Sequence, residues 1–170
     1  MSQIQLLNDN FLGYYPNMNP EPDLIDRKIL SLLQNDATIS VDAISEAVTL
    51  SRNACWRRIK QMEDRGVITA RVALVNPAAV GCALQAMVMI RTNAHDAKWM
   101  ADFQSALKTM PEVVGAYRMT GDLDYVLRVR VADVPAYDAF YKRLTSRICV
   151  SDISASFVME DMKDTTAVPL

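Results

Sequence analysis

Cysteine, histidine and long apolar runs are scarce in this chain, and each shortage excludes a class of protein. The three cysteines, Cys55, Cys82 and Cys149, are far apart and never form a C-x-x-C pair, so we expect neither a disulfide framework nor a zinc site. No apolar run approaches the roughly 20 residues of a membrane-spanning helix, and the first residues lack the basic and apolar regions of a signal peptide. We therefore expect a cytoplasmic protein with no membrane partner.

Patterns typical of enzymes are missing as well. His95 is the single histidine and lies in a polar turn, where a solvated loop residue is a simpler interpretation than a catalytic base or a metal ligand. The sequence contains no nucleophile elbow, phosphate-binding loop or dinucleotide-binding glycine pattern. We expect no catalytic residue, no metal and no cofactor.

The composition is typical of a folded globular protein, with 51% hydrophobic and 22% charged residues. A length of 170 residues suffices for two small domains. The net charge of −2 argues against a uniformly basic nucleic-acid binder. The basic charge is instead concentrated in one helix-sized segment, at Arg52, Arg57, Arg58, Lys60, Arg65 and Arg71.

The first third of the chain predicts an irregular arm followed by three helices. Residues 1–23 contain three prolines among Asn and Asp, which favours an irregular arm. Apolar residues then recur at helical spacing, with polar residues facing away at Asp26, Arg27, Lys28 and Ser31. Ser40 and Ser51 are predicted N-caps of the second and third helices, and Gly66 is predicted to end the third. Two helices joined by a tight turn after a supporting helix make a helix-turn-helix.

The third helix has one apolar and one polar face. Cys55, Ile59 and Met62 share a narrow face, and the opposite side is polar and cationic. A recognition helix needs this division, because it packs on its support while it inserts side chains into the major groove. An isolated basic cluster is more often a solvated surface, but the preceding helix and turn favour DNA binding. The predicted DNA contacts are Ser51, Arg52, Asn53, Trp56, Arg57, Arg58 and Lys60.

Cys55 is interpreted as a small apolar core residue. A redox-sensing thiol would need solvent access and neighbouring cations. Arg52 and Arg58 flank Cys55 in the sequence, so this alternative stays open at this point.

A wing and a hinge are predicted after the third helix. Residues 67–75 are rich in β-branched side chains, which favours one or two short strands, the wing of a winged helix. Asn76, Pro77 and Gly81 then favour a turn and unusual backbone angles. We therefore expect a DNA-binding domain over 24–75 and a hinge over 76–82.

The second half alternates between strand and helix patterns. The predicted strands are 83–91, 113–120, 124–131 and 151–160, and the predicted helices are 96–110 and a segment around 134–144. The third strand alternates between apolar and basic side chains, and the last strand is predicted to present Ile153, Ala155, Phe157 and Met159 on one face. The order βαββαβ is that of a ferredoxin-like sheet with two helices on one side, so the whole protein is classed as α+β. We expect a second subunit to cover the other face of this domain, residues 83–170.

The turn at residues 120–125 permits two interpretations. A tight hairpin explains Gly121 and requires no ligand. Asp122 and Asp124, however, place two carboxylates close together next to an expected subunit interface. Such groups could bind the ammonium of an amino acid while the amides of the turn hold its carboxylate.

Three motifs together resemble one family of regulators. Residues 25–30, residues 50–68 and the segment Thr120–Tyr125 are similar, in order and spacing, to the leucine-responsive/asparagine-operon (Lrp/AsnC) family of bacterial and archaeal transcription regulators. The resemblance covers Leu24 to the C-terminus. One departure is that family members usually carry a Pro-Gly turn before the last strand, where residues 147–151 stand here.

The resemblance implies a winged helix-turn-helix joined to a βαββαβ domain that senses an amino acid, and dimers that often assemble into octamers. It implies effector contacts at Thr120, Gly121, Asp122, Asp124, Ser154 and Ser156. The Cys55–Trp56 pair and residues 117–119 look most similar to a cysteine-responsive branch of the family.

The sequence therefore predicts a sequence-specific regulator that binds double-stranded DNA and whose binding or assembly responds to an amino acid, with cysteine as the named candidate. The alternative is a chromatin-like architectural DNA-binding protein without an effector. A third hypothesis is a small-molecule enzyme or sensor in which the first helices only dimerise.

Overall fold

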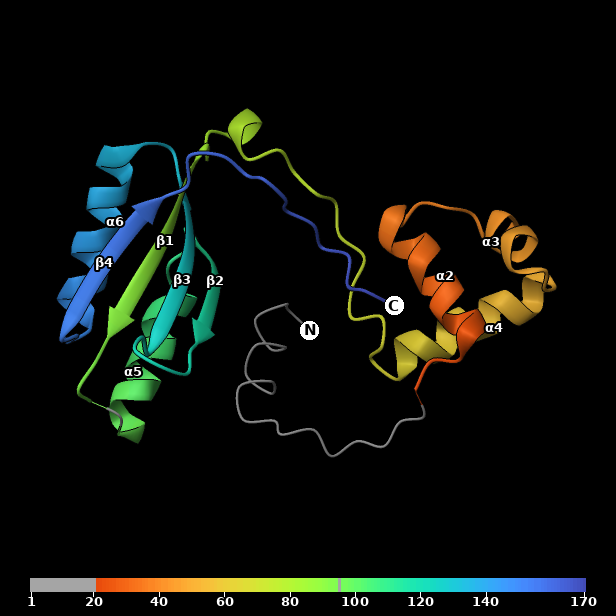
Figure 1. Cartoon of the computed structure of the whole chain (residues 1–170), viewed down its shortest axis with the longest axis horizontal. Coiled ribbons are helices and arrows are strands. Elements are labelled where there is room, and N and C mark those ends of the chain that lie inside the picture. The colour runs from red at the N-terminus through yellow and green to blue at the C-terminus, as the bar shows by residue number, and fades with distance from the viewer. Residues whose placement is uncertain (1–20, 95) are drawn as a thin grey trace. The chain divides into compact units, whose positions relative to one another are not determined.

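The computed structural model describes residues 21–94 and 96–170. Most of the predicted N-terminal arm, residues 1–20, and the polar turn residue His95 lie outside the described residues. The chain divides into two compact units, one with residues 21–74 and 163–170 and the other with residues 75–162 (Figure 1). The C-terminal segment 163–170 thus groups with the first unit, whereas the sequence-based boundaries assign it to the second domain.

The first unit contains the three predicted helices, which are α2 (Leu24–Asn35), α3 (Val41–Val48) and α4 (Arg52–Asp64). The Ser40 side chain accepts the backbone N–H of Ala43 at 3.1 Å, and Ser51 accepts that of Ala54 at 3.3 Å. Both N-caps predicted from the sequence are therefore confirmed. Thr49 adopts the left-handed conformation with φ 56°, which ends α3 and allows the tight turn into α4.

The core of the first unit joins all three helices. Its fully or nearly fully buried side chains include Ile29 of α2, Ile44 of α3, and Cys55, Ile59 and Met62 of α4. The apolar face predicted for the third helix is confirmed. Cys55 has no exposed surface, so it serves as a core residue, and its burial argues against the redox-sensing alternative.

The position of Asp26 in α2 differs from the prediction. Asp26, predicted to face away, is buried because the Arg58 guanidinium of α4 lies 2.8 Å from its carboxylate and 2.8 Å from that of Asp23. The hydrogen bonds that Arg58 donates to the carboxylates of Asp26 and then Asp23 raise the pKa of Arg58 above its ordinary value. The N–H of Asp26, followed by Arg58, lowers the pKa of Asp23. Arg58 thereby ties α4 to the N-terminus of α2, where a carboxylate is also favoured by the helix dipole.

The strands predicted at 67–75 are not formed in the described chain. Gly66 ends α4 with φ 72°, and residues 69–76 carry no regular element. Val72, Leu74 and Val75 are 54%, 75% and 62% exposed. The prediction from β-branched residues is wrong here because a strand needs a hydrogen-bonding neighbour. No segment among the described residues pairs with this one. A short 3₁₀ helix, η1 (Ala78–Val80), follows.

The second unit is the predicted βαββαβ fold, and its elements are β1 (Leu84–Arg91), α5 (Ala97–Lys108), β2 (Val113–Arg118), β3 (Tyr125–Val131), α6 (Val134–Arg147) and β4 (Asp152–Phe157). The strand order is β2-β3-β1-β4, and every neighbouring pair is antiparallel. This order confirms the ferredoxin-like topology. The last strand ends at Phe157 instead of Glu160, so Met159, predicted to share a strand face with Ile153, lies beyond the strand and is fully exposed. The ladder stops there because β1, its neighbour, begins at Leu84.

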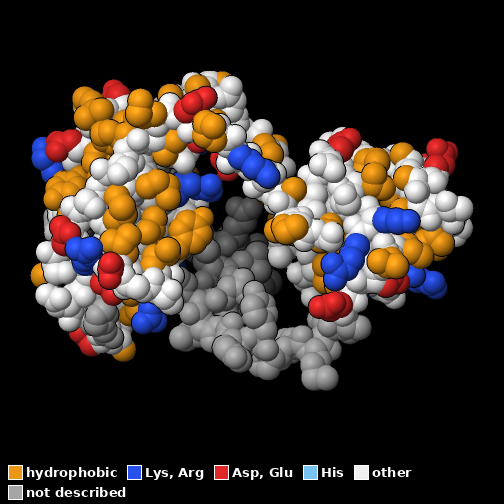
Figure 2. Space-filling view, viewed as in Figure 1, with side chains coloured by type: hydrophobic (Ala, Val, Ile, Leu, Met, Phe, Trp, Pro, Cys, Tyr) orange, Lys and Arg blue, Asp and Glu red, His pale blue; other side chains and the backbone are white. Residues whose placement is uncertain are grey.

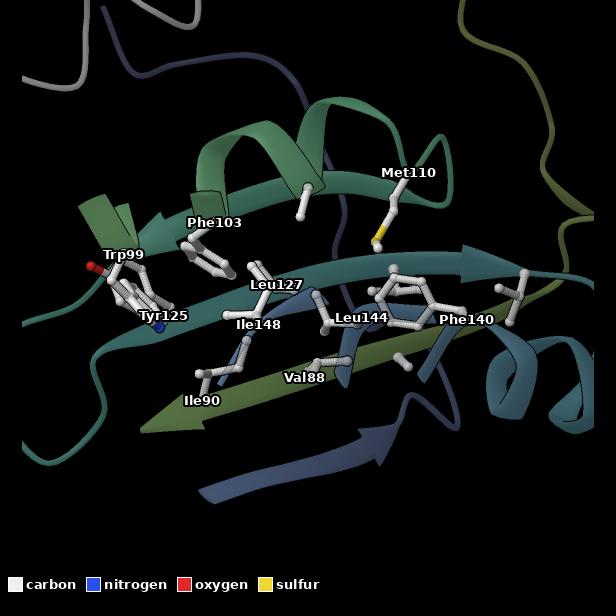
Figure 3. Close-up of a cluster of buried hydrophobic side chains, with 14 residues drawn as sticks. Val88, Ile90, Trp99, Phe103, Met110, Tyr125, Leu127, Phe140, Leu144 and Ile148 are labelled. Carbon is white, nitrogen blue, oxygen red and sulfur yellow. The ribbon is translucent and has the colours of Figure 1, made fainter. Parts of the chain in front are cut away.

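The core of the second unit lies between the sheet and the two helices (Figure 3). Alternate residues of β3 are buried, as the sequence pattern predicts, and the continuously apolar β1 alternates in the same way. The rings of Trp99 and Phe103 from α5 stack at 5.0 Å, and Tyr125 of β3 meets them at 5.6 and 4.8 Å. The Trp99 indole N–H donates to the carbonyl of Cys149 at 2.7 Å, which fastens α5 to the segment before β4.

We predict that Arg58→Ala lowers the free energy of unfolding of the first unit by about 2 kcal/mol, because it leaves Asp26 buried without its charged partner. Hydrogen exchange of the α2 and α4 amides measures this loss. Arg57→Ala, on the exposed face of the same helix, serves as the control and should change the exchange free energy by less than about 0.5 kcal/mol. Equal exchange in the two variants would show that the ion pair does not hold α4.

Candidate nucleic-acid interface and effector turn

The face of α4 that is turned away from the core is polar, cationic and open. Asn53, Arg57 and Lys60 are exposed, and the Trp56 ring is 59% exposed. A large aromatic side chain on the surface of a helix has no packing function in this unit, but it can contact a partner. The exposed face therefore combines hydrogen-bonding, cationic and aromatic groups on one rigid helix.

The cations of this face have weak partners or none. Arg52 lies 3.1 Å from Asp42, and Lys60 lies 3.0 Å from Asp64, with all four side chains at least half exposed. The hydrogen bond that Lys60 donates to the Asp64 carboxylate raises the pKa of Lys60. Exposed ion pairs of this kind contribute little stability, so DNA phosphates could replace either carboxylate. Arg57 makes no ion pair among residues 21–94 and 96–170.

The structure brings six of the seven predicted DNA residues to the exposed side and the first turn of α4. Ser51 caps that turn and still has its hydroxyl proton to donate. The first-turn amides of a helix also favour a bound anion. Arg58 differs from the other six, because its guanidinium is committed to Asp23 and Asp26. The sequence pattern missed this distinction, since it counted Arg58 only by its charge.

The β2–β3 turn is fastened to the end of β1 by several hydrogen bonds. The Asp124 carboxylate accepts the N–H of Thr92 at 2.8 Å, and the N–H of Asp124 donates to the carbonyl of Ile90 at 3.0 Å. The Arg91 side chain donates to the carbonyl of Asp122 at 2.9 Å. Sequence reasoning missed Arg91 and Thr92, although their position at the end of a predicted strand was a usable signal.

The exposed tip of this turn carries Thr120, Gly121 and Asp122. Gly121 has φ 105°, a conformation that an L side chain adopts only with strain. The two aspartates therefore differ. Asp124 braces the turn with its carboxylate, whereas the Asp122 side chain is exposed at the tip.

Ser154 and Ser156 lie on the sheet face opposite to the helices. Ser154 pairs with Met89 and Ser156 with Met87, and these methionines alternate with the buried residues of β1. Ser154 is the closer of the two serines to the end of β1 where the turn is fastened. The predicted effector residues thus divide between the turn and one neighbouring sheet face.

That sheet face has no covering element within the described residues. Its rows are Tyr117–Val126–Met89–Ser154, and Arg128–Met87–Ser156. Figure 2 shows hydrophobic side chains gathered over the strands on the face turned to the viewer. Tyr117 is 49% exposed. The row Tyr117–Val126–Met89 is therefore an apolar strip across three neighbouring strands, as interaction surfaces often carry.

Within residues 21–94 and 96–170, no group of three or more His, Cys, Asp or Glu side chains could hold a metal ion. No helix in the same described ranges is both long and apolar enough to cross a membrane.

Comparison with known proteins connects these two sites to one family. Residues 22–69 match the winged helix-turn-helix DNA-binding domain, and residues 85–168 match the Lrp/AsnC ligand-binding domain. The chain is 46% identical over 149 residues to the DNA-binding transcriptional activator DecR of Escherichia coli K12, covering 87% of this chain and 98% of that protein.

Solved structures agree with the sequence match. The crystal structure of an AsnC family transcriptional regulator from Agrobacterium tumefaciens has a TM-score of 0.83 and 48% identity, over 86% of this chain and 96% of that one. A transcriptional regulator of Neisseria meningitidis in complex with L-Met has a TM-score of 0.82 and 34% identity, over the same shares. These relatives are transcription regulators, and none of these comparisons favours the architectural or enzymatic alternatives. The chain belongs to the Lrp/AsnC family of DNA-binding transcription regulators, and joins a winged helix-turn-helix to an amino-acid ligand-binding domain.

Proposed function

We propose that the exposed face of α4 reads the major groove and that its flanking cations hold phosphates. The observation that carries this proposal is the division of α4 into a buried apolar face and an exposed face with Asn53, Trp56, Arg57 and Lys60. Arg57 is the base-reading candidate, because it is exposed and without an ionic partner in the described chain. Arg52 and Lys60 are phosphate contacts that exchange Asp42 and Asp64 for DNA. Arg58 positions α4 and does not contact the bases.

We also propose that the effector is an amino acid held at the β2–β3 turn. The exposed Asp122 carboxylate would bind the ammonium group, and the backbone amides around Gly121 would bind the carboxylate. Thr120 lies at the same exposed tip, and Ser154 and Ser156 on the adjoining sheet face would contact the side chain of the ligand. The relative in complex with L-Met supports methionine as the first amino acid to test. Cysteine remains the second candidate.

The open sheet face supports a homodimer. Tyr117, Val126, Met87 and Met89 offer apolar surface that a second copy of the sheet would cover. Assembly of dimers to an octamer is the further step that the family resemblance implies. The site of action of a regulator that binds the chromosome is the cytoplasm.

We predict that Arg57→Ala weakens binding to an operator fragment, selected by binding from genomic DNA, by about 1–3 kcal/mol and blurs its sequence preference. Lys60→Ala should weaken binding to all sequences alike. It should also reduce the slope of log affinity against log salt concentration by about one. Fluorescence anisotropy over a salt series measures both effects. Glu46→Ala on the exposed side of α3 is the control. If Arg57→Ala and Lys60→Ala both bind like the parent protein, α4 is not the recognition helix.

We predict that Asp122→Asn weakens the effect of L-methionine on operator binding at least about tenfold, because a neutral amide replaces the charge-assisted bond to the ammonium. Binding to the operator without effector should not change. Asp124→Ala should instead lower thermal stability, since the acceptor of the Thr92 N–H is lost. Titrating L-methionine, and L-cysteine in parallel, into each variant–operator complex distinguishes the two roles. A parental response from Asp122→Asn would remove Asp122 from the effector site.

A further inference from the structure

The C-terminal segment 163–170 has no regular secondary structure, yet it lies against α2 in the first unit. Ala167, Val168 and Leu170 form one wall of a shallow groove. The other wall is the face of α2 with Leu24, Arg27, Lys28, Ser31, Gln34 and Asn35. These residues follow helical spacing and lie opposite the buried Ile29 and Leu30. The segment therefore uses the side of α2 that does not pack on α3 and α4.

A reciprocal pair of hydrogen bonds joins the segment to α2. The backbone N–H of Val168 donates to Gln34 Oε1 at 2.7 Å, and Gln34 Nε2 donates to the carbonyl of Val168 at 3.2 Å. A primary amide carries an acceptor and a donor in one plane, as a peptide group does. Gln34 thus pairs with Val168 much as a residue of a neighbouring β-strand would.

The sequence of the segment favours the conformation that this pairing needs. Pro169 restricts the preceding Val168 to extended backbone angles. Thr165 accepts the N–H of Ala167 at 3.1 Å, which fixes the approach to Val168 and satisfies that amide. A segment with few accessible conformations loses less entropy when it docks.

We propose that residues 163–170 are a strap that docks on α2 through Gln34 and tethers the helix-turn-helix to the end of β4. The chain already passes directly from the first unit to the second between Leu74 and Val75. Residues 158–162 continue β4 into the strap, which is a second covalent connection. A helix-turn-helix that is held at two points has fewer orientations to give up when it binds DNA, so the strap increases operator affinity.

Hydrogen exchange of the whole chain tests docking without DNA or effector. The Val168 amide should exchange roughly tenfold more slowly than an unstructured amide. Gln34→Ala and Val168→Pro each remove one side of the pair, and the double variant should expose the segment no further than either single variant. Exchange of residues 163–167 reports docking in the Pro variant, which lacks the Val168 amide. Glu46→Ala is the control on the same unit. An unprotected Val168 amide in the parent protein, or protection that survives Gln34→Ala, would overturn the proposal.

Operator binding tests the consequence of docking. Gln34→Ala and Val168→Pro should each weaken binding to the operator fragment by roughly threefold, with an unchanged dependence on salt because no phosphate contact is lost. Equal operator affinity in the parent protein and in both freed variants would overturn the tethering role. A change in salt dependence would also overturn it, since Gln34 would then act at the DNA. Neither readout uses the effector, so failure of the proposed amino-acid site leaves this test unaffected.

Discussion

The contact of the Arg58 guanidinium with Asp23 and Asp26 is the interaction on which the proposed DNA-reading face of α4 depends. One nitrogen of the Arg58 guanidinium, Nη1, donates at 2.8 Å both to Asp23, the N-cap of α2, and to Asp26 in its first turn, beside the core formed by Cys55 and Ile59. Apolar contacts are non-directional, whereas charge-assisted hydrogen bonds require a defined donor–acceptor geometry and therefore limit rotation of α4 about its axis. The exposed side of α4 is therefore fixed. Arg57, the residue before Arg58, lies on that exposed side.

A similar division of roles occurs in the second unit. Of the two aspartates in the β2–β3 turn, Asp124 is used by the fold through the Thr92 amide, and Asp122 is left at the exposed tip. Arg57 and Arg58 in the first unit, and Asp122 and Asp124 in the second, are pairs of like residues with different roles. One member of each pair holds the local structure, and the other is exposed and available to a ligand. The separation comes from burial, which requires a charged group to have a partner.

Much of the architecture could be predicted from the sequence because it rests on local patterns. The N-caps at Ser40 and Ser51, the buried face of α4 and the alternation along β3 follow from spacing that the chain itself imposes. The prediction was wrong where the outcome depends on residues far away. Asp26 is buried because Arg58, distant in the sequence, reaches it, and no segment among the described residues pairs with residues 67–75 to make them a strand. Chain spacing also could not predict that Val168 would meet Gln34.

The central claim is that α4 contacts DNA through the face opposite to its buried core while the sheet of the second unit does not. Backbone NMR of the whole chain, with and without an operator duplex, tests this claim most directly. We predict that amide shifts concentrate at residues 51–60 and leave β1 to β4 nearly unchanged. Shifts concentrated on the open sheet face, with α4 unperturbed, would contradict it.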